Sequence, residues 1–166
     1  MRHVRKSISR FRAFVIPGGK MEIRLMRTDD YGPVRGLWLS CAGMGLNDRD
    51  DSEAGISAFL ARNPETCFVA EDGGKIVGAV LCGNDGRRAF IYHTAVSPLC
   101  RKRGIGRALV GAVEDALVRL GISKAALVVF SRNEAGNAFW EKLGFTERTD
   151  LSYRNKAFVE LRRIDT

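Results

Sequence analysis

The feature that most constrains the fold is an amphipathic helix predicted for residues 104–120. Its apolar residues recur at helical spacing, its charged residues occupy other positions, and Gly121 ends it. A strand predicted for Ala89–Val96 comes shortly before it. The chain therefore contains a strand, a connecting turn and a long helix, as in domains of the α/β class. The apolar positions are Ile105, Ala108, Leu109, Ala112, Val113, Ala116, Leu117 and Leu120.

The connecting turn combines three basic residues, Arg101–Arg103, with Gly104-Ile105-Gly106 at the start of the helix. Unpaired backbone N–H groups and the positive end of a helix dipole favour phosphate, and glycine lets the ligand approach the main chain. A tight turn with solvated basic side chains fits the same residues. Two common phosphate loops are excluded, because Gly-x-x-x-x-Gly-Lys-Ser/Thr is absent and Leu109 stands where the dinucleotide fingerprint needs glycine.

Length and composition indicate one globular domain. The chain has 166 residues, of which 45% are apolar and 28% charged, and no apolar run approaches the roughly 20 residues of a membrane helix. The cysteines lie far apart without a Cys-x-x-Cys pair, which argues against a zinc site or a disulfide framework and is consistent with a reducing cytoplasm. They are Cys41, Cys67, Cys82 and Cys100.

The net charge of +8 is concentrated in residues 1–20. This segment holds six of the 27 basic residues and no acid, which leaves 21 basic against 19 acidic residues in 21–166. It ends at Pro17-Gly18-Gly19 and lacks the apolar core of a secretory signal. We predict a loosely ordered basic extension, 1–20, before a single domain, 21–166. A basic arm for an acidic partner is the alternative, although the nearly neutral domain does not favour nucleic acid.

Two helices are predicted before the sheet. The first follows a strand near Met21 and starts at Thr28 as N-cap. The second runs from about 52 to 62 and stops at Asn63-Pro64. The loop between them, residues 43–51, carries several acids.

The remaining segments predict a sheet. Runs at 67–71, 75–82 and 89–96 are typical of an antiparallel meander. The apolar run 125–130 predicts a strand buried on both faces. A helix is predicted for 134–143, with Asn133 as its cap, and one or two terminal strands for 145–161.

Two motifs resemble the GNAT superfamily of N-acetyltransferases. The first is Arg/Gln-x-x-Gly-x-Gly/Ala after a strand that ends in a small residue, Val and a Pro-containing turn. It corresponds to Ala95-Val96-Ser97-Pro98 followed by Arg101, Gly104 and Gly106. The second is an Asn, a helix with an aromatic pair, and Gly-Phe. It corresponds to Asn133, Phe139-Trp140 and Gly144-Phe145, and the resemblance extends from Met21 to about Leu161.

The resemblance implies a GNAT-like α/β (α+β) fold, with a mixed, largely antiparallel sheet of six to seven strands flanked by about four helices. It implies an N-acetyltransferase that moves an acetyl group from acetyl-CoA to a primary amine by direct attack in a ternary complex, without a metal. The sheet would splay near Val96, whose N–H would stabilise the oxyanion. Asn133 serves equally well as a plain N-cap. The implied cofactor-binding residues are Ala95, Val96, Arg101, Lys102, Arg103, Gly104, Ile105, Gly106, Arg107, Asn133 and Trp140.

The chain departs from the family at Trp140, where many members have a tyrosine that protonates the leaving thiolate. Indole cannot act as this acid, so Trp140 is a wall of the thioester pocket or part of the core. On the strand before Val96, strict alternation places Tyr92 and His93 on opposite faces. Both are candidate bases, and histidine has the better intrinsic pKa. The family resemblance implies that Tyr92 and Phe90 face the acceptor. We therefore expect Tyr92 to be the catalytic residue and His93 to be a satisfied histidine under a helix, unless a bulge near Thr94 reverses the parity.

Three functions follow from the sequence: an active N-acetyltransferase, a silent acyl-CoA-binding protein, and a nucleic-acid binder that uses the basic extension. We favour the first. The acceptor and the oligomeric state are left open, a homodimer included.

Overall fold

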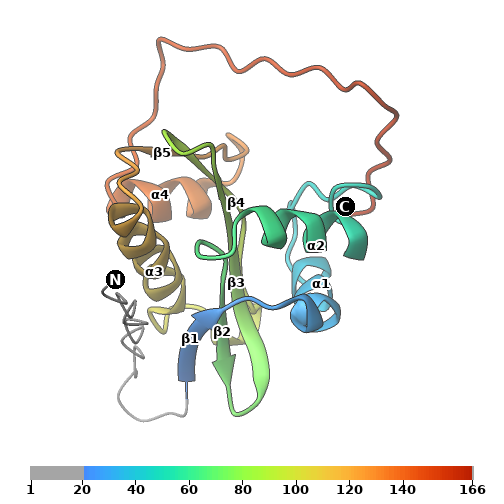
Figure 1. Ribbon diagram of the computed structural model, residues 1–166. Coiled ribbons are helices and arrows are strands. Elements are labelled where there is room, and N and C mark those ends of the chain that lie inside the picture. Colours follow the sequence, from blue (N-terminus) through green and yellow to red (C-terminus); the bar gives the residue numbers. More distant parts are fainter. Residues whose placement is uncertain (1–20, 166) are drawn as a thin grey trace, which may run out of the picture.

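The computed structural model describes residues 21–165, so the basic extension predicted for 1–20 lies outside the described residues. The described chain forms one sheet between two layers of helices (Figure 1). The elements are β1 (Met21–Leu25), the 3-10 turn η1 (Thr28–Asp30), α1 (Tyr31–Leu39), α2 (Glu53–Arg62), β2 (Phe68–Asp72), β3 (Lys75–Asn84), β4 (Ala89–Val96), the 3-10 turn η2 (Pro98–Cys100), α3 (Ile105–Arg119), β5 (Ala125–Ala126) and α4 (Glu134–Lys142).

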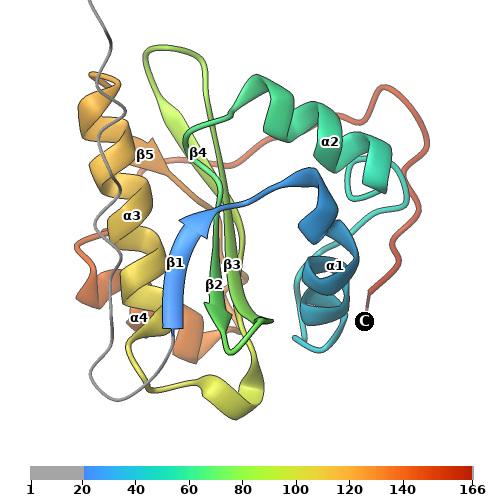
Figure 2. The same cartoon turned by 60° about the horizontal axis from the view of Figure 1, so that its bottom comes forward.

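The sheet has the order β1-β2-β3-β4-β5 and is antiparallel except for the parallel pair β4 and β5. Helices α3 and α4 lie on one side of it and α1 and α2 on the other (Figures 1 and 2). The mixed, largely antiparallel α/β fold with four helices is thereby confirmed. The strand count differs, because the described residues contain five strands instead of six or seven.

Each face of the sheet has its own apolar core. Towards α3, the buried residues Phe68, Val80 and Ile91 pack against Leu109 and Val113. Towards α1 and α2, strand residues such as Val69 and Leu81 pack against Trp38 and Leu60. Neighbouring residues of one strand enter opposite cores, as the two-residue period of a strand requires.

Local sequence signals set most helix boundaries. The side chain of Ser52 caps α2 by accepting the Gly55 N–H, and Asn133 caps α4 by accepting the Gly136 N–H. Gly121 follows α3 with a φ of +73°, a conformation that glycine adopts without strain. The prediction for Thr28 was wrong. Thr28 begins the turn η1, and α1 starts three residues later, because the Asp30 carboxylate accepts the Arg27 N–H and closes that turn first.

Two strand predictions were also wrong. Only Ala125–Ala126 of the run 125–130 pairs with β4, and Val128 and Phe130 are 58% and 40% exposed, so this run is not buried on both faces. No strand forms in the described part of 145–161. The β5 ladder ends at Ala126, so it offers these residues no long edge to pair with.

The chain after α4 instead crosses to the α1 and α2 side of the sheet (Figure 1). There Arg163 forms a bridge with Asn47, and the Asp48 N–H donates to the Arg162 carbonyl at 2.9 Å. Both carboxylate oxygens of Asp165 accept backbone N–H groups, from Gly45 and Leu46. The end of the chain therefore holds the loop between α1 and α2.

An ion-pair network fastens β1 to the turn before α1. Arg24 contacts Asp30 at 2.7 Å and Glu71 at 2.8 Å, and the Asp30 side chain is only 11% exposed. The hydrogen bond from Arg24, helped by the Arg27 N–H and the charge of Arg24, holds the pKa of Asp30 below its ordinary value despite its burial. A carboxyl group whose pKa is lower in the folded state stabilises the fold above its unfolded pKa, and this stabilisation is lost as the pH falls through the folded pKa.

We predict that Asp30→Asn lowers the free energy of unfolding at pH 7 by roughly 1–3 kcal/mol, because it leaves Arg24 with one carboxylate partner. Urea denaturation from pH 7 downwards should show a constant difference from the wild type until about pH 4, and a shrinking one below as wild-type Asp30 takes up a proton. The exposed neighbour provides a control, Asp29→Asn, which should behave like the wild type. Equal stability of Asp30→Asn and the wild type at pH 7 would contradict the network's role.

Candidate active site

Strands β4 and β5 separate after their second residue pair. They pair only at Ala89 with Ala125 and at Phe90 with Ala126, so β4 continues to Val96 without β5 beside it. On its other edge β4 stays paired with β3 up to Val96 opposite Gly78, and the Ser97 N–H donates to the Val77 carbonyl. N–H groups alternate sides along a strand. The Val96 N–H therefore points away from β3, towards the side that β5 has left.

The turn into α3 presents unused backbone donors. No side chain caps α3, its first turn contains no acid, and the first helical bond runs from the Ala108 N–H to the Gly104 carbonyl. The N–H groups of residues 105–107 consequently project from the helix start, where the dipole is positive. Lys102 and Gly104 both have positive φ, +60° and +81°. This tight backbone turn brings the basic residues against the helix start.

The four basic side chains of this turn are exposed, and two of them have partners. Arg103 forms an ion pair with Asp72 at 3.3 Å. Arg101 turns back and donates from Nε to the Val96 carbonyl at 3.3 Å. Lys102 and Arg107 have no ion pair or hydrogen bond of this kind among the described residues, so they are free to bind an anion.

Gly106 marks a close approach between α3, α4 and the end of β4. A Cβ atom at this position would lie 3.1 Å from the Phe139 ring and 3.7 Å from Val96. At Gly104 the space is open, but the positive φ disfavours any other residue. The two glycines are therefore needed for different reasons, one for packing and one for backbone conformation.

Asn133 and Trp140 both have structural partners. Asn133 is the N-cap of α4, as one of the two sequence readings expected. The Trp140 ring lies edge-on to Phe139 and Phe145, with centroids 5.1 Å apart in each case. It packs on the α3 side of the core while remaining partly exposed. Trp140 thus belongs to the edge of the core beside the parted strands.

A β-bulge changes the parity of β4. Leu81 pairs with Tyr92 and Ala79 with Ala95, so β4 has one residue more than β3 in this interval. His93 takes up the extra length with a φ of +44°. The bulge that the sequence analysis allowed for near Thr94 therefore reverses the strict alternation: Tyr92 contacts Phe59 of α2 and His93 contacts Trp38 of α1, both on the same side of the sheet.

Tyr92 sits in an aromatic cluster on that side. Its ring centroid is 5.8 Å from that of Phe59 and 4.7 Å from that of Phe90, and 42% of the residue is exposed. Burial raises the pKa of its phenol, with smaller contributions from Tyr153 and Cys82. The hydroxyl is therefore protonated near neutral pH and can donate or accept a hydrogen bond, but it is a poor source of phenolate.

His93 does have a partner beneath a helix, as expected, and the partner is charged. Its Nε2 lies 2.6 Å from a carboxylate oxygen of Asp51, which is 4% exposed. The sequence placed Asp51 among the loop acids without singling it out. The sequence allowed for a bulge near Thr94, but the strand pattern does not show whether it forms or which loop acid it brings to His93.

Cys41 was also missed as a neighbour of the site. Its Sγ lies 3.7 Å from the Val96 carbonyl and 3.9 Å from a guanidinium nitrogen of Arg101. All four cysteines are free. Burial raises the pKa of Cys67 to about 11 and that of Cys82 to about 12, so these two are neutral thiols in the core.

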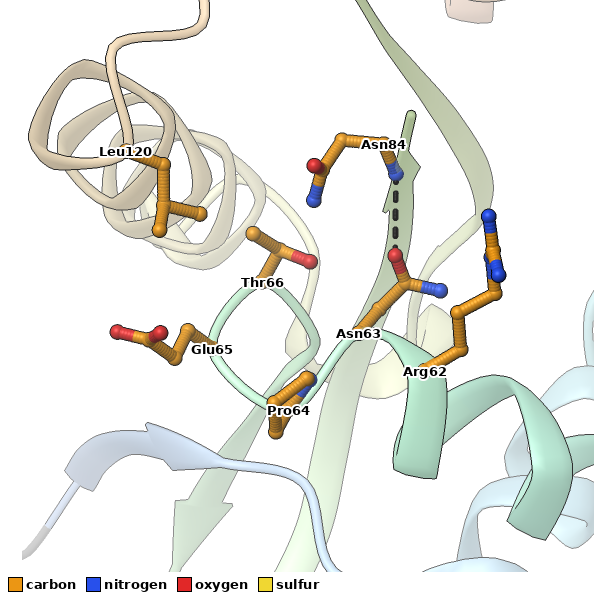
Figure 3. A pocket seen from close by; sticks show the side chains of 7 residues that line it. All are labelled: Arg62, Asn63, Pro64, Glu65, Thr66, Asn84 and Leu120. Atoms are coloured by element: carbon orange, nitrogen blue, oxygen red, sulfur yellow. Dashed lines mark hydrogen bonds between the residues drawn. The ribbon is translucent and has the colours of Figure 1, made fainter. Parts of the chain in front are cut away.

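Two surface hollows lie away from the parted strands. One, of about 180 Å³, is formed by the end of α2, the following loop, Asn84 and Leu120 (Figure 3). Its buried polar groups are already paired: Asn63 bonds Asn84 and Phe59, and Thr66 bonds Cys82. The other runs along β1 beside Pro64. Within residues 21–165 we find no group of metal-ligating side chains and no helix long and apolar enough to cross a membrane.

Comparison with known proteins identifies the family. The sequence profile of the acetyltransferase (GNAT) family matches residues 33–145. An acetyltransferase of Pectobacterium atrosepticum is 38% identical over 140 residues, which cover 84% of this chain and 97% of that protein. The chain belongs to the GNAT family of acetyltransferases.

Solved GNAT structures share the fold. The ribosomal-protein-S18-alanine N-acetyltransferase of Escherichia coli superposes with a TM-score of 0.64 at 25% identity, over 78% of this chain and 79% of that one. The yncA protein of Salmonella typhimurium, solved with its cofactor acetyl-CoA, has a TM-score of 0.64 at 24% identity, over 76% and 79% of the two chains. This acetyltransferase thus shares its overall fold with solved GNAT structures.

We predict that Gly106→Val weakens the binding of CoA by about tenfold or more, roughly 1.4 kcal/mol. A branched side chain there must displace Phe139 and Val96 beside the helix start. Gly111, in the same helix with open space at its Cβ position, offers a matched control, Gly111→Val, which should bind CoA like the wild type. Calorimetric titration measures both affinities, and circular dichroism verifies folding. A folded Gly106→Val variant with unchanged CoA affinity would refute the assignment of this turn.

Proposed function

We propose that this GNAT protein transfers an acetyl group from acetyl-CoA to a primary amine by direct attack in a ternary complex. The observation that carries the proposal is the combination of parted strands β4 and β5 with uncapped N–H groups and free basic residues at the start of α3. The first feature leaves strand backbone exposed for an extended ligand. The second is a binding place for a pyrophosphate.

The residues present fit acetyl-CoA in charge and shape. The N–H groups of residues 105–107, with Lys102 and Arg107, supply donors and positive charge for the pyrophosphate. Glycine at 104 and 106 keeps side chains off the helix start. Ala95 and Val96 line the edge of β4 that β5 leaves, where the pantetheine arm would lie along the backbone. We assign cofactor binding to Ala95, Val96, Arg101, Lys102, Arg103, Gly104, Ile105, Gly106, Arg107, Asn133 and Trp140.

The backbone of Val96 is suited to the chemical step. Attack on the thioester builds negative charge on the carbonyl oxygen, and a fixed N–H aimed at that oxygen stabilises it. The Val96 N–H points towards the parted strands, and its carbonyl is held by Arg101. This contribution depends on the backbone, so it is insensitive to the side chain at 96.

A tyrosine at position 140 would supply a phenol to protonate the leaving thiolate, but this chain has Trp140 there. Indole N–H is not a usable acid near neutral pH. The edge-on contacts of Trp140 with Phe139 and Phe145 suit it to shield the thioester region from water. A thiolate is a good enough leaving group to depart with a proton from the attacking amine, and the lost acid catalysis is worth about 10²–10⁴ in rate at most.

An amine acceptor is supported by the polar groups on the side of the sheet that faces α1 and α2. The E. coli neighbour is named as an N-acetyltransferase for alanine of ribosomal protein S18. Here the face beside β4 carries the hydroxyl of Tyr92 and the His93–Asp51 pair. Oxygen and nitrogen acceptors of this kind bind an ammonium group before it loses its proton.

The function is tested by following release of the CoA thiol from acetyl-CoA with a panel of amines: amino acids, polyamines, aminoglycosides, peptide N-termini and a lysine peptide. The full chain and residues 21–166 should bind acetyl-CoA within about tenfold of each other and use the same acceptor, because we assign no part of the site to 1–20. Binding of acetyl-CoA without thiol release for any amine would favour the silent binding protein. Loss of binding on truncation would show that the extension belongs to the functional domain.

We predict that Tyr92→Phe lowers kcat by about tenfold or more with little change in acetyl-CoA affinity. The variant keeps the ring that packs on Phe59 and Phe90 and removes only the hydroxyl that would hold the amine. Steady-state kinetics with the best acceptor of the panel, together with calorimetric titration of acetyl-CoA, measure the two quantities. Wild-type kcat in this variant would remove Tyr92 from the mechanism.

A further inference from the structure

The β4 bulge places the His93 ring on the side of the sheet that faces α1 and α2, where it meets the Asp51 carboxylate. His93 has a left-handed backbone conformation, shared only with Lys102 among the non-glycine residues that the structure describes. Such a conformation is unfavourable for a side chain and persists where the surrounding structure demands it. Its effect here is to turn the His93 ring onto the same side of the sheet as Tyr92.

Asp51 is held in place before it meets His93. One carboxylate oxygen accepts the Asn47 N–H at 2.7 Å, and its backbone carbonyl accepts the Tyr31 hydroxyl at 2.9 Å. The other carboxylate oxygen lies 2.6 Å from His93 Nε2. A carboxylate can only accept hydrogen bonds, so in its neutral form the His93 ring would carry its proton on Nε2 and its lone pair on Nδ1.

The Nδ1 lone pair has no partner in residues 21–165, and the side chain is 16% exposed. Nε1 of Trp38, whose ring touches the imidazole, is also buried and unpaired within the described chain. Buried polar groups are normally satisfied. The partly exposed Nδ1 of His93 is thus a polar atom that can bind a ligand from solvent.

Residues of α1 and just after it contact both His93 and the end of β4, where the thioester would lie. Trp38 touches the His93 ring, and Cys41, just after the helix, touches the Val96 carbonyl. The two residues are one helical turn apart, about 5 Å along the axis. The imidazole and the end of β4 thus lie along the same edge of α1.

We propose that His93 is the general base of the transfer and that Asp51 is the positioning residue that fixes its ring and tautomer. This inference rests on the proposed N-acetyl transfer. His93 Nδ1 takes one proton from the acceptor ammonium. The amine nitrogen then bonds to the thioester carbon, the C–S bond breaks, and the thiolate leaves with its electron pair. The thiolate takes the second proton from the nitrogen, and His93 returns its proton to solvent.

Some of the side chains around His93 can also gain or lose a proton. Asp51 is the charged side chain that contacts it from the loop before α2. From the start of α1, Tyr31 reaches the Asp51 carbonyl, and Trp38 does not titrate. Tyr92 is its neighbour on β4, and the pKa of that phenol is raised by burial.

The test uses the full chain and two acceptors: the best amine of the panel, which carries a proton at neutral pH, and hydroxylamine, which does not. We expect His93→Gln to lower kcat for the amine on the order of 10²-fold and to affect hydroxylamine much less, because a base is needed mainly to remove the ammonium proton. The acidic limb of kcat/KM that belongs to the base should vanish. Imidazole added to His93→Ala should restore part of the activity.

Asp51→Asn should lower kcat about tenfold and leave acetyl-CoA affinity unchanged, because it disturbs the tautomer of His93. The control is its exposed neighbour, Asp50→Asn, which should match the wild type, since the Asp50 carboxylate is exposed and accepts from the Asn47 side chain. A purely structural pair would instead lower the rates with both acceptors equally, and imidazole would not rescue them. That outcome, or an unaltered pH profile in His93→Gln, overturns the base. Failure of the wild type with every amine overturns the proposed function itself.

Discussion

The separation of β4 from β5 is the constraint on which the rest of the site depends. A strand that loses its neighbour along part of its length exposes a row of backbone N–H and C=O groups, which an aqueous protein must hydrate or pair with a ligand. β4 tolerates this because β3 holds its other edge up to Val96 and the Ser97 N–H continues that ladder. The same separation shortens β5 to Ala125–Ala126, so the following residues have no ladder to join.

Two backbone irregularities convert this strand edge into a site with two ends. At one end, the positive φ of Lys102 and Gly104 folds the basic turn against the uncapped start of α3. At the other, the bulge at His93 brings the imidazole onto the side where Tyr92 already lies. The end that we propose for acetyl-CoA consists of backbone N–H groups and basic side chains. In the proposed transfer to an amine, the acceptor end would use side chains that can hold and remove a proton.

The acceptor end is assembled from distant parts of the chain. Asp51 is fixed by Asn47, and Asn47 in turn forms a bridge with Arg163 near the C-terminus. Asp165 holds the neighbouring N–H groups of the same loop. The orientation of His93 is thus coupled to the last residues of the chain.

The sequence by itself determined the elements whose signals are local. The apolar spacing of 105–120 defines α3, Asn133 caps α4, and the glycines after Arg103 predict the anion-binding turn, because each depends only on neighbouring residues. Two motifs in the right order also revealed the family. Only the tertiary structure decided the face of His93, its pairing with Asp51 and the loss of the terminal strands. These depend on strand register and on whether a neighbouring edge is available, and a single extra residue in β4 reverses the parity without leaving any mark on the alternation of polar and apolar residues.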